Sequence, residues 1–130
     1  MKLTSYTIFF LFSLALNACG NKKEINEFNS IVKSGIWNVT ELSVNNENEL
    51  NESIIQFDFK ENQKLLILTS ANIHEANWVY GDIFLGLHFS NFPTQLNYFH
   101  GKYVIDKLSN DEIVARKEEQ GDVTKMTLKK

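Results

Sequence analysis

The residues that could do chemistry are one cysteine, Cys19, and three histidines, His74, His88 and His100. Gaps of 14 and 12 positions separate the histidines, unlike the short spacings of helical or zinc-finger ligand sets. Strand pairing could bring His74 and His88 together, but a pair of surface or cavity-lining histidines is the interpretation we favour.

Other catalytic patterns do not occur in the sequence. It has no glycine-rich phosphate loop, no Gly-x-Ser-x-Gly elbow and no EF-hand loop. Its carboxylates are scattered over turns and outward strand positions, where solvated side chains belong. The sequence therefore predicts no enzyme activity, no catalytic residues, no cofactor and no bound metal.

Aromatic side chains are the second group that could build a site, because pockets for apolar ligands are lined by such residues. The candidates for ligand contact are Trp37, Phe57, Phe59, Trp78, Phe89 and Tyr103. Phe84, on the expected strand over 83–89, could also line such a pocket. The alternative is that these rings fill a core at the usual packing density of about 0.74. Large side chains on short strands favour a largely filled interior.

The segment before Cys19 has the pattern of an export signal. Lys2 is followed by an apolar run over 8–16, too short for a membrane-spanning helix of about 20 residues. The run ends in Leu16-Asn17-Ala18-Cys19, which resembles the bacterial lipobox. The resemblance implies that a diacylglycerol is attached to the Cys19 thiol and that residues 1–18 are removed as a lipoprotein signal peptide.

Cysteine suits this role because its thiolate is the nucleophile that can take the lipid. Two or three acyl chains then hold a protein lastingly on a membrane. We expect residues 19–34 to form a lipid-anchored tether and a short helix. Lys22 and Lys23 stand where surface-displayed lipoproteins of Bacteroidota carry acidic residues, so the expected location is the outer membrane, facing the periplasm.

Composition limits the remaining possibilities. The 130 residues include 43% apolar and 22% charged residues, which is ordinary globular usage and excludes a disordered chain. One cysteine excludes an intrachain disulfide. The net charge of −3 makes nucleic acid a poor partner. We expect a single domain and a monomer.

The pattern after Gly35 predicts strands joined by tight turns. Apolar and polar residues alternate at Ile55, Phe57 and Phe59, and again over 83–89. The eight expected strands lie at 36–44, 55–60, 65–69, 73–80, 83–89, 102–108, 113–115 and 123–129. Strands without intervening helices favour an antiparallel sandwich or barrel. A helical spacing of apolar residues over 24–34 predicts one short helix that covers an end of the domain.

Gly35-Ile36-Trp37 at the start of the first strand resembles the Gly-x-Trp opening of lipocalins and other calycins. The wider layout resembles the small lipocalin-like lipoproteins of Bacteroidota: an alternating Phe strand over 54–60, a Trp strand at 77–79, a Leu-x-Phe strand at 87–89 and three closing strands ending in lysine. The resemblance covers residues 35–130 and implies an all-β, eight-stranded antiparallel up-and-down barrel. Trp37 is then expected to close the barrel base against a late basic residue such as Arg116 or Lys129.

Two functions fit these observations. In the first, a membrane-anchored lipocalin-like lipoprotein of the bacterial envelope binds a small apolar molecule in the barrel, through a mouth near the loops 45–51 and 90–98. In the second, a non-enzymatic protein-interaction or structural envelope module has a filled barrel and an exposed apolar patch. The candidates for that patch are Phe84, Phe92 and Tyr98.

Lipid attachment through Cys19 predicts that the chain incorporates radiolabelled palmitate when it is expressed in a bacterium. The Cys19→Ser chain should incorporate none, because serine offers no thiolate. Equal labelling of the two chains would contradict the anchor.

Overall fold

The computed structural model describes residues 27–50, 54–81, 83–89 and 96–130. Cys19, the lipobox and the tether lie outside these residues, and so do Phe92 and parts of the two expected mouth loops. Within the described part, no helix has the length and apolar character needed to cross a membrane.

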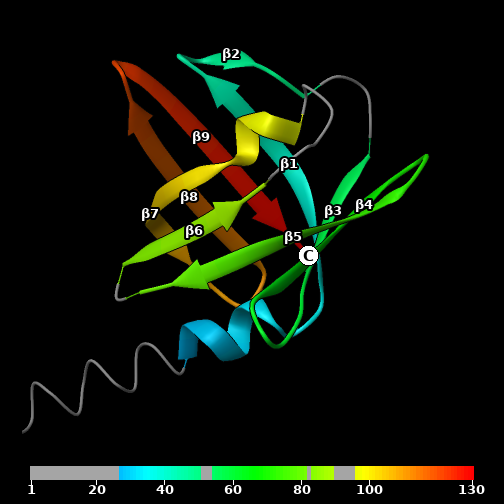
Figure 1. Ribbon diagram of the computed structural model, residues 1–130. Helices are drawn as coiled ribbons and strands as arrows, with labels where there is room; N and C mark the ends of the chain where they lie inside the picture. Colours follow the sequence, from blue (N-terminus) through cyan, green and yellow to red (C-terminus); the bar gives the residue numbers. More distant parts are fainter. Residues whose placement is uncertain (1–26, 51–53, 82, 90–95) are drawn as a thin grey trace, which may run out of the picture.

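The strands form one antiparallel sheet that closes into a barrel of eight strands with one extra strand (Figure 1). Their bounds are β1 Ile36–Val44, β2 Glu47–Asn48, β3 Ile55–Phe59, β4 Lys64–Thr69, β5 Ile73–Tyr80, β6 Phe84–His88, β7 Gly101–Leu108, β8 Glu112–Glu119 and β9 Asp122–Lys129. A 3-10 turn, η1, covers Leu96–Phe99. Each strand from β3 onward pairs with the next along the chain.

Pairing of β1 with β9 closes the barrel. It runs from Asn38↔Lys129 to Val44↔Thr124 and contains a register shift between Val39 and Glu41. On its other side β1 pairs with β3 over three residues only, Ile36 to Asn38. The long first strand therefore joins the two ends of the sheet, so that neither β1 nor β9 keeps an open edge along this stretch.

The extra strand β2 lies in a segment for which the sequence predicts a loop. It folds back on the end of β1, with Ser43↔Asn48 and Val44↔Glu47 in register. The turn between them is Asn45-Asn46, and both residues have positive φ, 51° and 67°. Two such residues in a row form the two-residue hairpin turn that matches strand twist, and asparagine accepts this conformation more readily than most residues.

The eight predicted strands are all present, with differences at their ends. β8 is the largest difference, because the pattern predicts only 113–115 and the strand continues to Glu119. The sequence Arg116-Lys117-Glu118-Glu119 reads as polar, but the long backbone pairing with β9 extends to Glu119↔Asp122. At this point pairing outweighs the low strand propensity of charged residues.

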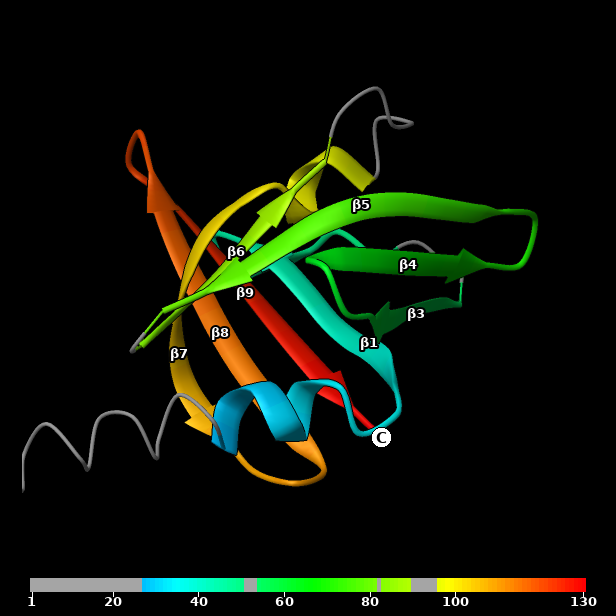
Figure 2. The same ribbon diagram turned by 60° about the horizontal axis from the view of Figure 1, so that its bottom comes forward.

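One end of the barrel is covered by a short helical piece over 27–32 (Figure 2). Its apolar side chains Phe28 and Val32 are buried, and Phe28 packs on Tyr80 with ring centroids 5.4 Å apart. Trp37 lies beneath it and donates its indole N–H to the Val32 carbonyl at 2.9 Å. Residues 24–26 of the expected helix lie outside the described part.

The basic residue that meets Trp37 is Lys130. Its Nζ lies 4.9 Å from the centre of the Trp37 ring and donates a hydrogen bond to the Ser34 hydroxyl. The expectation of a late cation is met at this position, but the two residues named for it are engaged elsewhere. Arg116 pairs with Asp106, and Lys129 pairs with Glu112. The chain end thus meets the end of the helical piece, as Figure 2 shows.

The hairpin turn gives a stability prediction. Asn46→Ala should lower the free energy of unfolding by about 1 kcal/mol, because a Cβ without a local polar group disfavours positive φ. Asn46→Gly should lower it by less than Asn46→Ala, and urea unfolding at constant m-value measures both. If alanine were as stable as glycine here, the turn would not have the described backbone.

Candidate functional site

The six aromatic candidates all lie inside the barrel. Each is at most 5% exposed, and Trp37, Phe57 and Tyr103 are fully buried. The strand pattern explains this, because inward positions alternate with outward ones along β3, β5 and β6. The structure brings four of them, Phe57, Phe59, Trp78 and Phe89, into one cluster. Trp37 lies at the helical end and Tyr103 near the opposite end.

Edge-to-face contacts hold this cluster together. Phe57 packs on Phe99 with ring centroids 5.0 Å apart and on Phe59 at 6.0 Å. Phe59 packs on Trp78 at 5.2 Å, nearly perpendicular to it. These are the arrangements that aromatic pairs prefer, and they leave the rings in contact with one another. Phe99 comes from η1, an element that the strand pattern does not predict.

The polar atoms of the buried aromatic residues are bonded within the protein. The Trp78 indole N–H donates to the Lys60 carbonyl at 3.0 Å, and the Tyr103 hydroxyl donates to the Tyr98 carbonyl at 3.2 Å. Among the described residues, no buried side-chain nitrogen or oxygen lacks a partner. A ligand that entered here would find neither a free polar handle nor unpaired rings on these residues.

The end of the barrel opposite the helical piece carries a hollow of about 540 Å³. It is lined by Val44, Asn97, Tyr98, Lys117, Glu119, Gln120, Asp122 and Thr124. Lys117 reaches inward, is 8% exposed, and its Nζ donates to the His100 carbonyl. Burial lowers the pKa of the Lys117 ammonium, and Glu119, 3.9 Å away, partly opposes this effect. The lining of this hollow is polar rather than apolar.

A glycine makes room for this lysine. Gly101 has a φ of +138°, and a Cβ there would lie 2.9 Å from Cδ of Lys117 and 2.8 Å from a carboxylate oxygen of Glu119. The glycine therefore lets the lysine and its carboxylate pack against the first residue of β7. Tyr103 lies on the other side, its ring centre 5.5 Å from the lysine Nζ.

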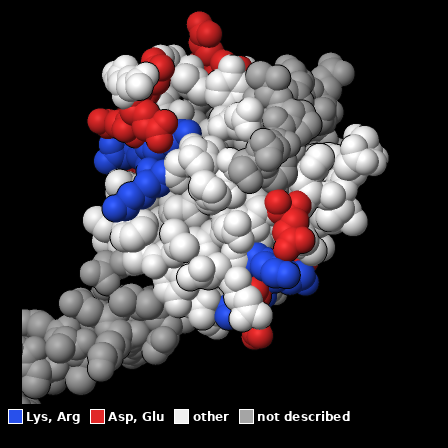
Figure 3. Space-filling model, viewed as in Figure 1, with Lys and Arg blue, Asp and Glu red and all other residues white. Residues whose placement is uncertain are grey.

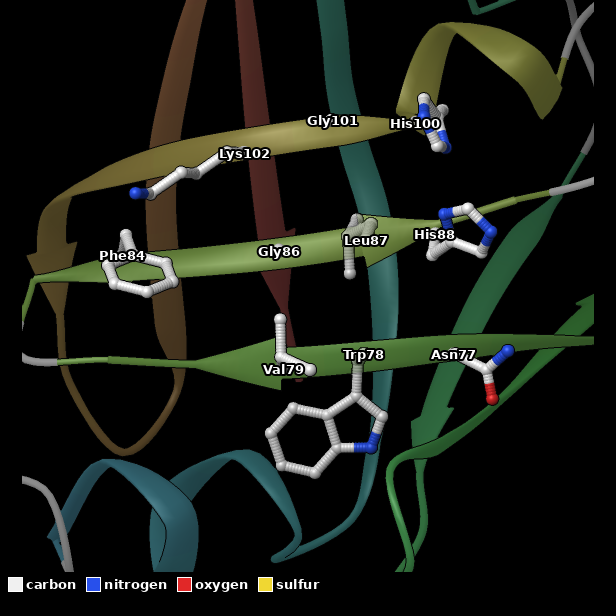
Figure 4. A pocket seen from close by; sticks show the side chains of 10 residues that line it. All are labelled: Asn77, Trp78, Val79, Phe84, Gly86, Leu87, His88, His100, Gly101 and Lys102. Atoms are coloured by element: carbon white, nitrogen blue, oxygen red, sulfur yellow. The ribbon is translucent and has the colours of Figure 1, made fainter.

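A second hollow, of about 300 Å³, lies on the outer face of β5, β6 and β7 (Figure 4). It is lined by Asn77, Trp78, Val79, Phe84, Gly86, Leu87, His88, His100, Gly101 and Lys102. We call it the outer groove. Gly86 faces outward between Val79 on β5 and Lys102 on β7, its partners in register, so the middle of the groove has no side chain of its own.

Two histidines meet at one end of the outer groove. The rings of His88 and His100 lie 5.1 Å apart, whereas His74 is on the opposite, inward phase of its strand. The two histidines that the topology brings together are therefore not His74 and His88, the pair that strand pairing could have joined. The sequence places His100 after a proline-containing segment, and only the pairing of β6 with β7 reveals the contact.

This pair is a poor metal site. His100 Nδ1 accepts a hydrogen bond from the Phe89 N–H at 3.0 Å, so the neutral ring carries its proton on Nε2, where a metal would bind. Within the described part, no three His, Cys, Asp or Glu residues come together as ligands. The two imidazoles are instead available as polar groups at the rim of the groove.

Burial also changes the ionisation of one tyrosine, and this change can be measured. Burial raises the pKa of the Tyr103 hydroxyl above its usual value near 10, and Glu119 adds to this effect. We expect Tyr103→Phe to leave unchanged the tyrosinate absorbance gained by the folded protein between about pH 9 and 11. In urea, the wild type should gain one tyrosinate more than the variant.

The raised pKa of Tyr103 also makes the free energy of unfolding depend on pH. The unfolded chain gives up this proton before the folded chain does, so the free energy of unfolding falls as pH rises above about 10. The fall should be smaller in Tyr103→Phe. A folded-state absorbance gain that shrinks in the variant would contradict the burial of this hydroxyl.

Comparison with known proteins identifies no relative of the chain. No protein-family model, no curated protein and no solved structure matches the chain. The resemblance to lipocalin-like lipoproteins therefore stays a prediction from the residues quoted for it.

Proposed function

We propose that the chain is a lipid-anchored, non-enzymatic protein of the bacterial envelope, whose barrel is a filled scaffold that works through its surface. The observation that carries the proposal is the packing of the inward aromatic residues. Phe57, Phe59 and Phe99 fill the interior against one another, and the polar atoms of Trp37, Trp78 and Tyr103 bond to backbone carbonyls.

The anchor belongs to this proposal and is supported by the lipobox-like sequence that ends at Cys19. A helical piece follows the tether directly and lies on one end of the barrel, so that end of the domain would stand nearest the membrane. The proposed location remains the outer membrane with the domain facing the periplasm. The finer assignment, an up-and-down barrel of the lipocalin-like lipoproteins of Bacteroidota, is supported by Gly35-Ile36-Trp37 and by the neighbour-to-neighbour order of the strands.

The other candidate function is transport or storage of a small apolar molecule inside the barrel. The hollow at the η1 end favours it, because it opens where the mouth is expected and has a volume within the range of ligand pockets. Its lining argues against an apolar ligand, because Lys117, Glu119 and Asp122 contribute charge. Native mass spectrometry of the full chain, released gently from its host membranes, separates the two functions.

A filled barrel predicts that the chain carries its lipid and no small molecule inside the barrel. A molecule that leaves on unfolding, and that is also retained by a Gly86→Val chain with a blocked outer groove, would mean that the interior holds it. The filled-scaffold proposal would then fall, whatever the result for the outer groove.

A cavity variant supplies the matched test. Phe57→Ala should cost about 3–5 kcal/mol of unfolding free energy and open an apolar cavity. Benzene should then raise the melting temperature of the variant, because it binds only the folded state, and should leave the wild type unchanged. If benzene stabilised the wild type equally, the interior would already be empty.

A further inference from the structure

The outer groove exists because β6 places a glycine at an outward position. A Cβ on Gly86 would lie 2.7 Å from Cγ2 of Val79, so any larger residue would push into the groove. Val79 stays 43% exposed beside it, and the ring of Phe84 borders the groove two residues along the strand. Glycine in a strand often marks a place where a ligand or another backbone approaches closely.

Charge in the groove has one sign. Its lining contains no carboxylate, and its one charged residue is Lys102. The Lys102 Nζ lies 4.1 Å from the centre of the Phe84 ring and forms no ion pair with any residue in the described part of the chain. A contact with a ring face leaves ammonium hydrogens free, so an anion can bind without displacing a carboxylate.

The surface around the groove is apolar. Figure 3 shows this face with charged side chains gathered in groups at its margins and an uncharged area between them. Val79 on β5, Val104 on β7 and Ile83, which directly precedes β6, are each more than 40% exposed. The chemistry of the groove is therefore an apolar floor with a single cation at one end.

The opposite end offers a second polar contact. In Figure 4, Lys102 extends toward Phe84, whereas His88 and His100 lie at the other end of the groove. The Phe89 N–H already occupies Nδ1 of His100, so its Nε2–H remains a donor. The five residues from Phe84 to His88 are four steps of about 3.4 Å, so they span about 14 Å, the length of a small molecule. A stable protein interface needs about 800 Å² per partner, which is far larger than this groove.

From this combination we infer that the outer groove binds a small amphiphilic carboxylate, such as a medium-chain fatty acid, with its carboxylate on Lys102 and its apolar body along Gly86 toward the histidines. The inference goes beyond the proposed function. It uses only the outer face of the barrel, so it stands or falls independently of the anchor and of the filled core.

Octanoate is the probe, added to the full chain in phospholipid nanodiscs. Binding is followed by NMR shifts of the Val79 methyl groups and of the ring protons of His88 and His100. We expect saturable shifts confined to these residues. Octan-1-ol, which has the same chain length without the charge, should bind at least about tenfold more weakly, because it cannot form the charge-assisted bond to Lys102.

Two variants test the two halves of the groove, and a third is the control. Lys102→Gln should weaken octanoate binding about tenfold, and Gly86→Val should abolish it by filling the floor. Lys125→Gln is the matched control, because this lysine lies on the outer face of β9, outside the groove, and pairs with Glu41. Its binding of octanoate should equal that of the wild type.

Several results would overturn the inference. These are the absence of shifts up to the solubility limit, unchanged binding in Gly86→Val, or equal binding of octanol and octanoate. Shifts at the same residues that depend on protein concentration alone would also overturn it, because they would identify a second copy of the chain as the occupant. Lys102 is exposed and unpaired within the described residues, so its variant keeps the test valid if Gly86→Val does not fold.

Discussion

Closure of the sheet by β1 and β9 is the constraint on which the rest of the molecule depends. Eight strands enclose a space just wide enough to be filled by side chains or to hold one small ligand. The choice between these outcomes lies in the size of the inward residues. Here phenylalanine, tryptophan and tyrosine occupy the inward positions of β1, β3, β5 and β7, and η1 adds Phe99 from one end. The interior of the closed sheet is thus filled by packed side chains.

The two ends of the barrel are closed by different kinds of side chain. At the helical end, Phe28, Val32 and Trp37 form a buried apolar cluster. The ammonium group of Lys130 lies over the tryptophan ring. At the η1 end, Lys117 reaches into the barrel and needs the Gly101 conformation to fit beside Glu119. The first end gains stability from apolar burial, whereas the second holds a buried charge against its desolvation cost.

Local pattern was enough to predict most of the fold. Period-two alternation along 55–59 and 84–88 identifies both the strands and their inward faces, because one buried face fixes the phase. The same reasoning could not predict η1, the β2 hairpin or the full length of β8. Each of these depends on a contact with a distant segment or on backbone conformation, which the alternation of apolar residues does not report.

The expected ligand site stays a prediction, and its six aromatic candidates are buried in the core. Large aromatic residues are typical of apolar ligand sites, but they are also the residues that a small barrel needs for its core. The outer groove is marked by the opposite signal, the smallest residue at an outward position, Gly86, between two strands in register. Phe84 belongs to the same outward phase as Gly86 and His88, so alternation alone assigns it to the outside. The outward glycine and Lys102, which is unpaired in the described part of the chain, thus mark the groove that we infer to bind a ligand, and the large aromatic residues mark the core.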